Sequence, residues 1–347
     1  MSTLVVLWLV SLFIAGAAIT IMLGLIVARW ISGRRTRARE QERQRLIPLL
    51  LGASASAEPG GDVEAAPDLL ADLATELIQM VRGTDKENFV ASSSRLGVPE
   101  RLRQRMDHGS PRKRLAAAEG LADFPDERSI ERLREGLDDR NADVRLAAAL
   151  ALTSAGHAPP AKYLIEKLGI GTRENSMLAV GLFKEVAQYR PDEIKGVIQD
   201  GDTPPGAKAA AIDALASSGD YSLVPVISEL VLTSDPDAEE LPRYLRALAE
   251  FGHPASGKAI LFGLDSDRQD VRAAAAEAAG RVALAEAADK LAELLGDADW
   301  WVRFRAGEAL AALGEQGRAL LVEAAASGTE AASEAAQMTL EERGLTH

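Results

Sequence analysis

Five segments of this chain superimpose when the sequence is compared with itself at an offset of about 31 residues. In each copy a basic residue precedes an Ala-rich run, and successive basic positions are 31, 63, 64 and 31 residues apart. The double gaps leave room for two degenerate copies, near residues 175–179 and 242–246. Self-similarity at this period predicts a solenoid, in which each unit packs on its neighbours. The recurring basic residues are Arg114, Arg145, Lys208, Arg272 and Arg303.

The second half of each unit repeats in another way. Apolar pairs three or four residues apart, such as Leu133 with Leu137 and Leu164 with Leu168, mark one face of a helix. The Ala-rich first halves are also strong helix formers. Aromatic residues make up only 4% of the chain, and no alternating strand pattern is present. The sequence therefore predicts an all-α fold, an α-solenoid of roughly eight helix pairs.

The repeat pattern Asp-x-x-Val-Arg-x-x-Ala-Ala-x-Ala-Leu-Gly resembles the short bacterial HEAT-like repeat, the type also found in phycobilin lyases. Its nearest copies are residues 141–145, 268–272 and 301–314, and the resemblance extends over residues 84–344. It implies a HEAT-repeat (armadillo-type) α-solenoid. Families of this kind include scaffolds, assembly factors and a few enzymes, so the resemblance leaves the function open.

The N-terminus carries a second strong signal. No charged residue occurs over residues 4–28, and a helix crosses the hydrocarbon core of a bilayer with about 20 apolar residues. Arginines follow this run and none precedes it, which predicts an outside N-terminus and a cytoplasmic solenoid at a bacterial inner membrane. A cleaved signal peptide is the alternative, but it would need a basic start and a shorter apolar run. We therefore expect one transmembrane helix within residues 1–30.

Small residues recur every four positions in this apolar run. They would let two such helices pack closely and form a homodimer, although small residues are also common in membrane helices generally. The residues are Gly16, Thr20, Gly24 and Ala28.

The predicted domain plan has three parts after the anchor. Residues 31–50 form an Arg-rich arm, which either sets the topology or contacts anionic lipid or an acidic partner. Residues 51–67 are small and polar, as in a flexible linker, and residues 68–347 form the solenoid with its capping helices. The arm's expected membrane-surface residues are Arg34, Arg35, Arg37 and Arg39.

Charge separates these parts and limits the partners. Residues 1–50 carry seven Arg and two Glu, a net charge of +5. Because the net charge of the whole chain is −13, the remaining residues carry −18. An acidic solenoid is a poor partner for a phosphate backbone, and we expect no binding of nucleic acid.

The sequence contains no recognisable catalytic or metal-binding constellation. Cysteine is absent, and no two of the four histidines are spaced as metal ligands on one helix. Pairs of Asp such as Asp297 and Asp299 fall before first helices, where capping is a better interpretation than a calcium loop. We therefore predict no catalytic residues, no metal site and no cofactor.

Two sets of residues are left as candidates for a role. The basic ladder at 114, 145, 208, 272 and 303 is expected to link neighbouring repeats, with ligand binding as the alternative. The second set breaks the repeat at the start of the last clear copy, where Trp and Arg are typical interface anchors and local packing is the alternative. Its members are Trp300, Trp301, Phe304 and Arg305.

Two classes of function follow from this pattern. The first is a membrane-tethered scaffold or accessory subunit that binds a protein on the cytoplasmic face, for example in a polysaccharide-synthesis machine of the envelope. The second is a lyase-type enzyme or chaperone similar to the phycobilin-attaching HEAT proteins. We favour the scaffold because no convergent polar cluster is visible in the sequence.

Overall fold

The computed structural model describes residues 22, 40–51, 67–172 and 177–345. Within these ranges the ordered elements are helices, and no strand is present. The chain divides into two compact units after Arg132, and the helix α6 (Glu127–Gly136) contains the division. We refer to residues up to Arg132 as unit 1 and to residues from Leu133 onward as unit 2.

Unit 1 is built from short helices that are tied together by ion pairs. Residues 40–50 are helical, and Leu46 and Leu50 in this segment are buried. The guanidinium of Arg105 donates to the carboxylates of Asp68 and Asp72, and these bonds hold the helix at residues 98–108 against the helix at residues 67–78. The helices are α2 (Pro67–Ile78), α3 (Thr84–Arg95), α4 (Val98–His108) and α5 (Pro111–Leu121).

Unit 2 is a succession of helix pairs. Its α-helices are α7 (Ala142–Ser154), α8 (Ala161–Leu168), α9 (Met177–Tyr189), α10 (Pro191–Gln199), α11 (Pro205–Leu215), α12 (Leu223–Thr233), α13 (Leu241–Phe251), α14 (Gly257–Leu264), α15 (Gln269–Val282), α16 (Ala288–Leu294), α17 (Trp300–Ala312), α18 (Glu315–Ser327) and α19 (Glu330–Glu342). Single 3₁₀ turns are η2 (Ala216–Ser218), η3 (Pro254–Ser256) and η4 (Ala285–Ala287).

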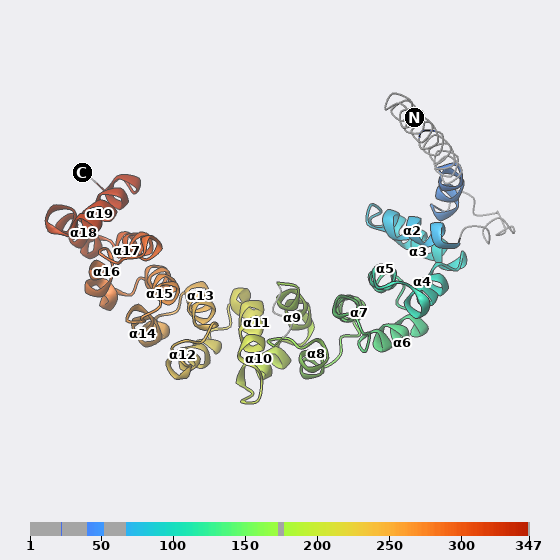
Figure 1. Cartoon of the computed structure of the whole chain (residues 1–347), viewed down its shortest axis with the longest axis horizontal. Coiled ribbons are helices and arrows are strands. Elements are labelled where there is room, and N and C mark those ends of the chain that lie inside the picture. Colours follow the sequence, from blue (N-terminus) through green and yellow to red (C-terminus); the bar gives the residue numbers. More distant parts are fainter. Residues whose placement is uncertain (1–21, 23–39, 52–66, 173–176, 346–347) are drawn as a thin grey trace, which may run out of the picture. The chain divides into compact units, whose positions relative to one another are not determined.

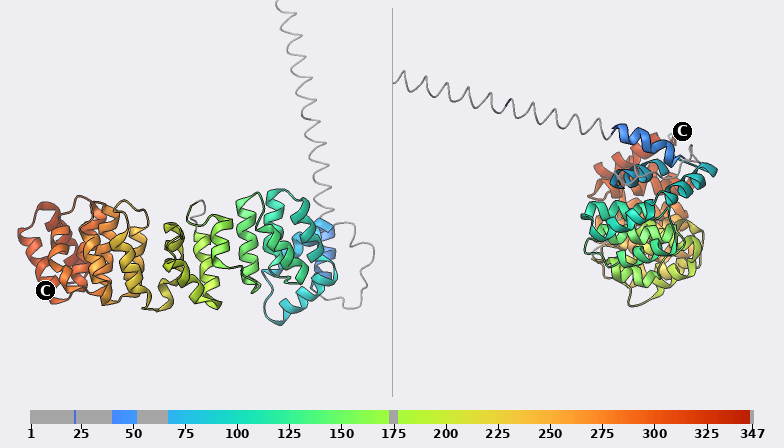
Figure 2. Two further views of the ribbon diagram at one scale, coloured as in Figure 1. Left: turned by 90° about the horizontal axis from the view of Figure 1, so that it is seen from below. Right: turned by 90° about the vertical axis from the view of Figure 1, so that its right-hand side faces the viewer.

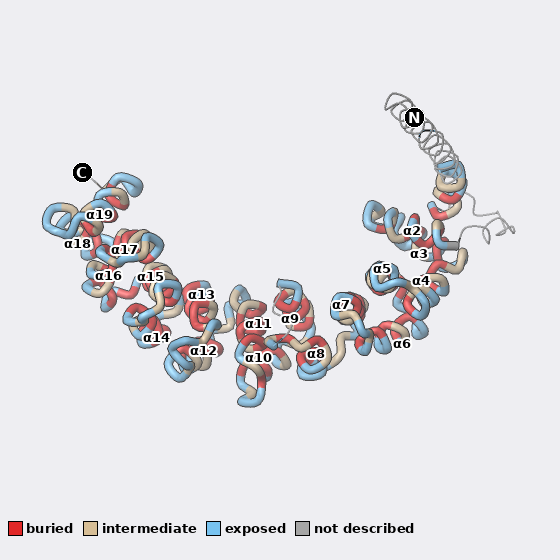
Figure 3. The backbone as a smooth tube through the Cα atoms, in the orientation of Figure 1, coloured by how far each residue is buried: buried red, intermediate tan, exposed pale blue. Residues whose placement is uncertain are grey.

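The helices of unit 2 form two rows (Figure 1). The first row contains α7, α9, α11, α13, α15, α17 and α19, each packed on the next member of the row. The second row contains α8, α10, α12, α14, α16 and α18. Each helix pair stands beside the following one (Figure 2), which is the arrangement that the 31-residue period predicts. Buried residues gather where the helices face each other, and exposed residues lie on their outer sides (Figure 3).

Alanine explains the close packing of the first row. Ala275 and Ala276 of α15 are fully buried. A Cβ placed on Gly280 of the same helix would lie 2.8 Å from the Cα of Ala309 in α17. These two helices therefore approach at backbone distance, which even a methyl group at Gly280 would prevent.

The basic ladder lies at the junctions between first helices and turns. In unit 1, Nη1 of Arg114 donates to the carbonyl of Gly109 at 2.9 Å. In unit 2, Arg145 donates to the carbonyl oxygens of Asp139 and Lys167. Arg303 likewise donates to the carbonyls of Asp297 and Ala298, and Lys208 is half-buried.

Arg272 makes the most extensive contacts of this ladder. Its Nε and Nη2 donate to the two carboxylate oxygens of Asp297 at 2.8 and 3.0 Å, and its Nη1 donates to the carbonyls of Ser266 and Asp267. The same carboxylate accepts the backbone N–H of Asp299 at 2.9 Å. One side chain thus joins α15 to the turns on both of its sides.

The predicted inner-membrane location is overturned by the structure. The apolar run at residues 4–28 lies outside the described residues except for Met22. Across the part of the chain that is described, no helix is long and apolar enough to cross a membrane. The longest of the helices with given bounds in the described residues is α15, with 14 residues, whereas a span takes about 20. The outside N-terminus and the homodimer through that helix depended on the same prediction, and Arg34, Arg35, Arg37 and Arg39 also lie outside the described residues.

Candidate partner-binding groove

The aromatic cluster lies at the start of α17. Trp300 and Trp301 are 47% and 57% exposed. Their ring centroids are 4.8 Å apart in an edge-to-face contact, and the ring of Trp300 stacks on Phe304 at 5.2 Å. The guanidinium of Arg305 lies 5.8 Å from the centre of the Phe304 ring. The structure therefore brings the four residues singled out from the sequence into one cluster.

Local sequence explains why these rings face outward. The Asp299 carboxylate accepts the backbone N–H groups of Trp301 and Val302, which starts the helix at Trp300. Val302 and Ala306, four residues apart, are fully buried and fix the inward face of α17. Trp301 and Arg305 occupy another stripe of the same helix, again four residues apart, and this stripe borders open space.

A hollow of about 330 Å³ adjoins Trp301. Trp301 and Arg305 line it from α17, Ala273 and Glu277 line it from α15, and Arg246 lines it from α13. All three helices belong to the first row, so the hollow crosses successive repeats on one surface of unit 2.

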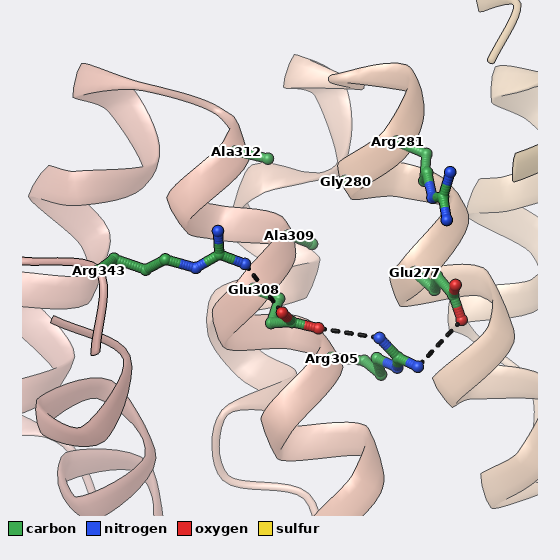
Figure 4. A pocket seen from close by; sticks show the side chains of 8 residues that line it. All are labelled: Glu277, Gly280, Arg281, Arg305, Glu308, Ala309, Ala312 and Arg343. Carbon is green, nitrogen blue, oxygen red and sulfur yellow. Dashed lines mark hydrogen bonds and ion pairs between the residues drawn. The ribbon is translucent and has the colours of Figure 1, made fainter. Parts of the chain in front are cut away.

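A second hollow of about 290 Å³ continues toward the C-terminal end (Figure 4). A chain of ion pairs crosses it. Arg343 bonds to Glu308 at 2.8 Å, Glu308 bonds to Arg305 at 2.9 Å, and Arg305 reaches Glu277 at 3.5 Å. Arg281 also borders this hollow, and Figure 4 shows its side chain outside the chain of ion pairs.

Glu277 and Arg305 border both hollows, so we treat them as one surface, the α13–α19 groove. Its floor is made of small residues because the first row needs them for close packing. Trp301 lines one of the two hollows and Arg343 lines the other. The residues of the groove are Arg246, Gln269, Asp270, Ala273, Ala274, Glu277, Gly280, Arg281, Asp299, Trp301, Arg305, Glu308, Ala309, Ala312 and Arg343.

The carboxylates of the groove are already engaged. Glu277 and Glu308 pair with arginines inside it, and Asp299 accepts backbone N–H groups. Asp270 is held by Arg268, which does not line the groove. Burial acts to raise the pKa of Asp270, but the hydrogen bonds and charge of Arg268, with the Val271 N–H, outweigh it and hold that pKa below its usual value. The groove therefore contains no carboxylate that needs a cation.

Two arginines of the groove have no such partner. Neither Arg246 nor Arg281 forms an ion pair with a described residue, and both are exposed. Glu277 lies four residues before Arg281, a spacing that favours pairing along a helix. Its carboxylate is instead bonded to Arg305 of the neighbouring helix. The groove thus has two cations to offer to a ligand.

Sequence reasoning identified one wall of this groove and missed the others. Trp301 and Arg305 line it, whereas Trp300 and Phe304 support them from the side. Arg246, Arg281 and Arg343 were missed because they come from α13, α15 and the residue that follows α19. The signal available was weak: Arg246 lies in a copy too degenerate to align, and Arg281 lies beyond the aligned part of its repeat.

A third hollow, of about 470 Å³, lies within unit 1 and is lined by basic residues that include Arg105 and Lys113. Both of them bond to Asp68. The hydrogen bond from Lys113 is the main reason why the pKa of Asp68 lies below its usual value, and Arg105 adds to it against the effect of burial. We interpret this cluster as a clamp between helices. Among the described residues no group of three metal-binding side chains could hold an ion.

Comparison with known proteins supports the fold. The sequence profile of HEAT repeats matches residues 99–172 and 257–341, so these two segments are similar to HEAT repeats. None of the curated proteins compared with the chain matches it.

Kap121p is among the solved structures that are similar to this chain. One crystal structure of Kap121p is 14% identical with a TM-score of 0.47, covering 86% of this chain and 41% of that one. Kap121p bound to RanGTP is also 14% identical, with a TM-score of 0.48, and covers 86% of this chain and 38% of that one. This chain therefore spans about two fifths of the length of these structures. Human deoxyhypusine hydroxylase in complex with glycerol is 17% identical with a TM-score of 0.32, covering 89% and 98% of the two chains.

Proposed function

We propose that this chain is a scaffold that binds a partner protein in the α13–α19 groove, with Trp301 as the main anchor and Trp300 beside it. The HEAT-repeat solenoid is a fold typical of protein-interaction scaffolds. The observation that carries the proposal is the half-exposed Trp301 in the lining of the groove, with the half-exposed ring of Trp300 against it. Exposed aromatic surface next to a hollow is the usual composition of an interface anchor.

The contribution of Trp301 to the binding free energy follows from its exposure. An aromatic side chain of this class buries about 150–250 Å² when it is fully covered. Trp301 is 57% exposed, so a partner could cover roughly 100 Å² of it. At about 25 cal/mol per Å² this contributes about 2.5 kcal/mol to binding, which is within the range of an interface hot spot. Because the ring is already largely in water, Trp301→Ala should cost the fold little.

The scaffold proposal concerns unit 2 alone and includes neither a membrane tether nor a particular envelope machine. For the lyase-type and chaperone alternatives, the described part of the chain shows no cluster of reactive side chains that would support them. The groove is lined by methyl groups, arginines and engaged carboxylates, which suit the holding of a peptide surface better than acid–base chemistry.

Affinity purification with quantitative mass spectrometry tests this proposal. The full chain, Trp301→Ala and Phe262→Ala are used as baits from the same cells. Phe262 is the matched control because it is an aromatic residue, 42% exposed, on α14 in the second row. We expect at least one protein to be retained by the wild type and by Phe262→Ala, and to fall about 70-fold with Trp301→Ala, as about 2.5 kcal/mol implies. Identical sets of proteins from both variants would refute the proposal, provided that circular dichroism shows equal thermal stability.

A further inference from the structure

The chemistry of the α13–α19 groove narrows the kind of partner that fits it. Three properties matter, namely the low floor, the apolar wall at Trp301 and the balance of charge. The floor consists of Ala273, Ala274, Gly280 and Ala309, so space remains above it for side chains of a ligand.

The balance of charge favours a ligand with carboxylates. Four arginines and four carboxylates line the groove. Arg305 and Arg343 pair with Glu277 and Glu308, Asp270 pairs with Arg268 from outside the groove, and Asp299 accepts two backbone N–H groups. Arg246 borders the half with Trp301, and Arg281 borders the half with Arg343. A ligand that lies along both halves would therefore contact the tryptophan and both of these guanidinium groups. A guanidinium presents a planar fork that bonds a carboxylate with two parallel hydrogen bonds.

A nucleic acid fits the same surface poorly. Its backbone carries one charge for about every 1.7 Å of duplex, and the groove offers only two cations without a partner. Glu277 and Glu308 would lie against the phosphates. The residues after 50 also carry a net charge of −18, which repels a nucleic acid. A protein segment with a few carboxylates at separate positions carries fewer negative charges, so it meets the arginines with much less of this repulsion.

We infer that the α13–α19 groove binds an acidic segment of a partner protein, in which an apolar or aromatic side chain packs on Trp301 and carboxylates pair with Arg246 and Arg281. This inference rests on the proposed function. The lining of α17 runs from Trp301 to Ala312, which corresponds to about 16 Å of helix. An extended segment of about five residues has this length.

A selection from a library of random 12-residue peptides tests the inference with the full chain as target. Recovered peptides are measured by fluorescence polarisation against the wild type, Trp301→Ala and the double variant Arg246→Glu/Arg281→Glu. The control is Lys184→Glu/Lys258→Glu, which changes the net charge equally at exposed lysines on α9 and α14 that do not line the groove. Circular dichroism confirms that each variant is folded.

We expect the recovered peptides to be rich in Asp and Glu and to include an aromatic or large aliphatic residue. Their affinity should fall at least tenfold with the Arg246/Arg281 variant, weaken as salt is raised, and change less than threefold with the lysine control. Peptides that depend on Trp301 but are neutral or basic, or that bind the arginine variant as well as the wild type, would overturn the inference while leaving the scaffold proposal intact. If no recovered peptide depends on Trp301, the proposed function of the groove is wrong as well.

Discussion

The ion pair between Arg272 and Asp297 provides the sharpest test of how the repeats of unit 2 are held together. The pair is nearly buried, with 17% of the Arg272 side chain and 7% of the Asp297 side chain exposed. We propose the change Asp297→Asn, which keeps the size and the acceptor for the Asp299 N–H but removes the charge. The matched control is Asp265→Asn, because Asp265 pairs with Lys290 at 2.7 Å but its side chain is 70% exposed.

The expected cost follows from what Arg272 loses. The two bonds to Asp297, at 2.8 and 3.0 Å, are charge-assisted and fork-shaped, and bonds of this kind contribute about 1.5–3 kcal/mol. Removal of one partner of a fully buried pair costs about 3–5 kcal/mol. Arg272 keeps its two carbonyl acceptors and some contact with water, so we place the loss at the lower end, about 2 kcal/mol. The exposed control pair should cost less than about 1 kcal/mol.

Local stability is the appropriate readout, because the units of a solenoid need not unfold together. Amide hydrogen exchange followed by mass spectrometry reports the opening of α15 and α17 separately from the other helices. In Asp297→Asn, exchange in these two helices should be about 30-fold faster, which corresponds to about 2 kcal/mol. Asp265→Asn should change exchange in the same helices by less than about fivefold.

The pH dependence gives a second check with a fixed sign. Burial acts to raise the pKa of Asp297, but the hydrogen bond from Arg272, the Asp299 N–H and the positive charges of Arg272 and Arg303 together hold it below its usual value. A carboxyl whose folded pKa is lowered stabilises the protein above its unfolded pKa, about 4, and loses this contribution as the pH falls through the folded value. The difference between wild type and Asp297→Asn should therefore be constant from neutral pH to about pH 5 and shrink below about pH 4. Equal hydrogen exchange of α15 and α17 in Asp297→Asn and Asp265→Asn would refute the role of the ladder as a link between repeats. A difference between wild type and Asp297→Asn that grows as the pH falls would refute it as well.

Two further predictions concern packing inside the first row. Gly280→Ala should destabilise unit 2 by about 1–3 kcal/mol, since its Cβ would meet the Ala309 Cα at 2.8 Å. Gly196→Ala on α10, where a Cβ meets nothing within 4 Å, should instead stabilise the protein by about 0.5–1 kcal/mol in denaturant melts. If both substitutions changed the free energy of unfolding in the same direction, this account of the packing would be contradicted. Burial first, and then the charge of Glu240, raise the pKa of Tyr244 to about 12. In a spectrophotometric titration Tyr244→Phe should therefore remove the step at the highest pH, and loss of an earlier step would show that the ring is not buried.

Most of the fold could be predicted because it depends on local and repeated properties. The Ala-rich runs and the apolar pairs each specify a helix without reference to distant residues, and the period then specifies which helices are neighbours. The degenerate copies near residues 175–179 and 242–246 do correspond to α9 and α13 of the first row. The charge pattern of the N-terminus, by contrast, led to an inner-membrane location that the described helices do not support.

The groove was less accessible to sequence reasoning than the fold. Trp301 and Arg305 were visible because they replace the residues typical of their positions in the repeat. Nothing in the sequence distinguishes Arg246 and Arg281 from other surface arginines. They differ because neither forms an ion pair with any residue that the structure describes. Glu277 precedes Arg281 by four residues and would be assigned to it from sequence, yet Arg305 of the next helix takes that carboxylate.

The same residues that make the solenoid stable also make room for a ligand. Gly280 and Ala309 let α15 and α17 approach at backbone distance, and for that reason no side chain rises above the floor between them. A larger residue at Gly280 would both separate the helices and occupy the groove. The specificity of the site must therefore come from its rim, where Trp301, Arg246 and Arg281 stand, and not from its floor. A rim can vary from repeat to repeat without disturbing the stack, which is why a regular fold can present one particular binding surface.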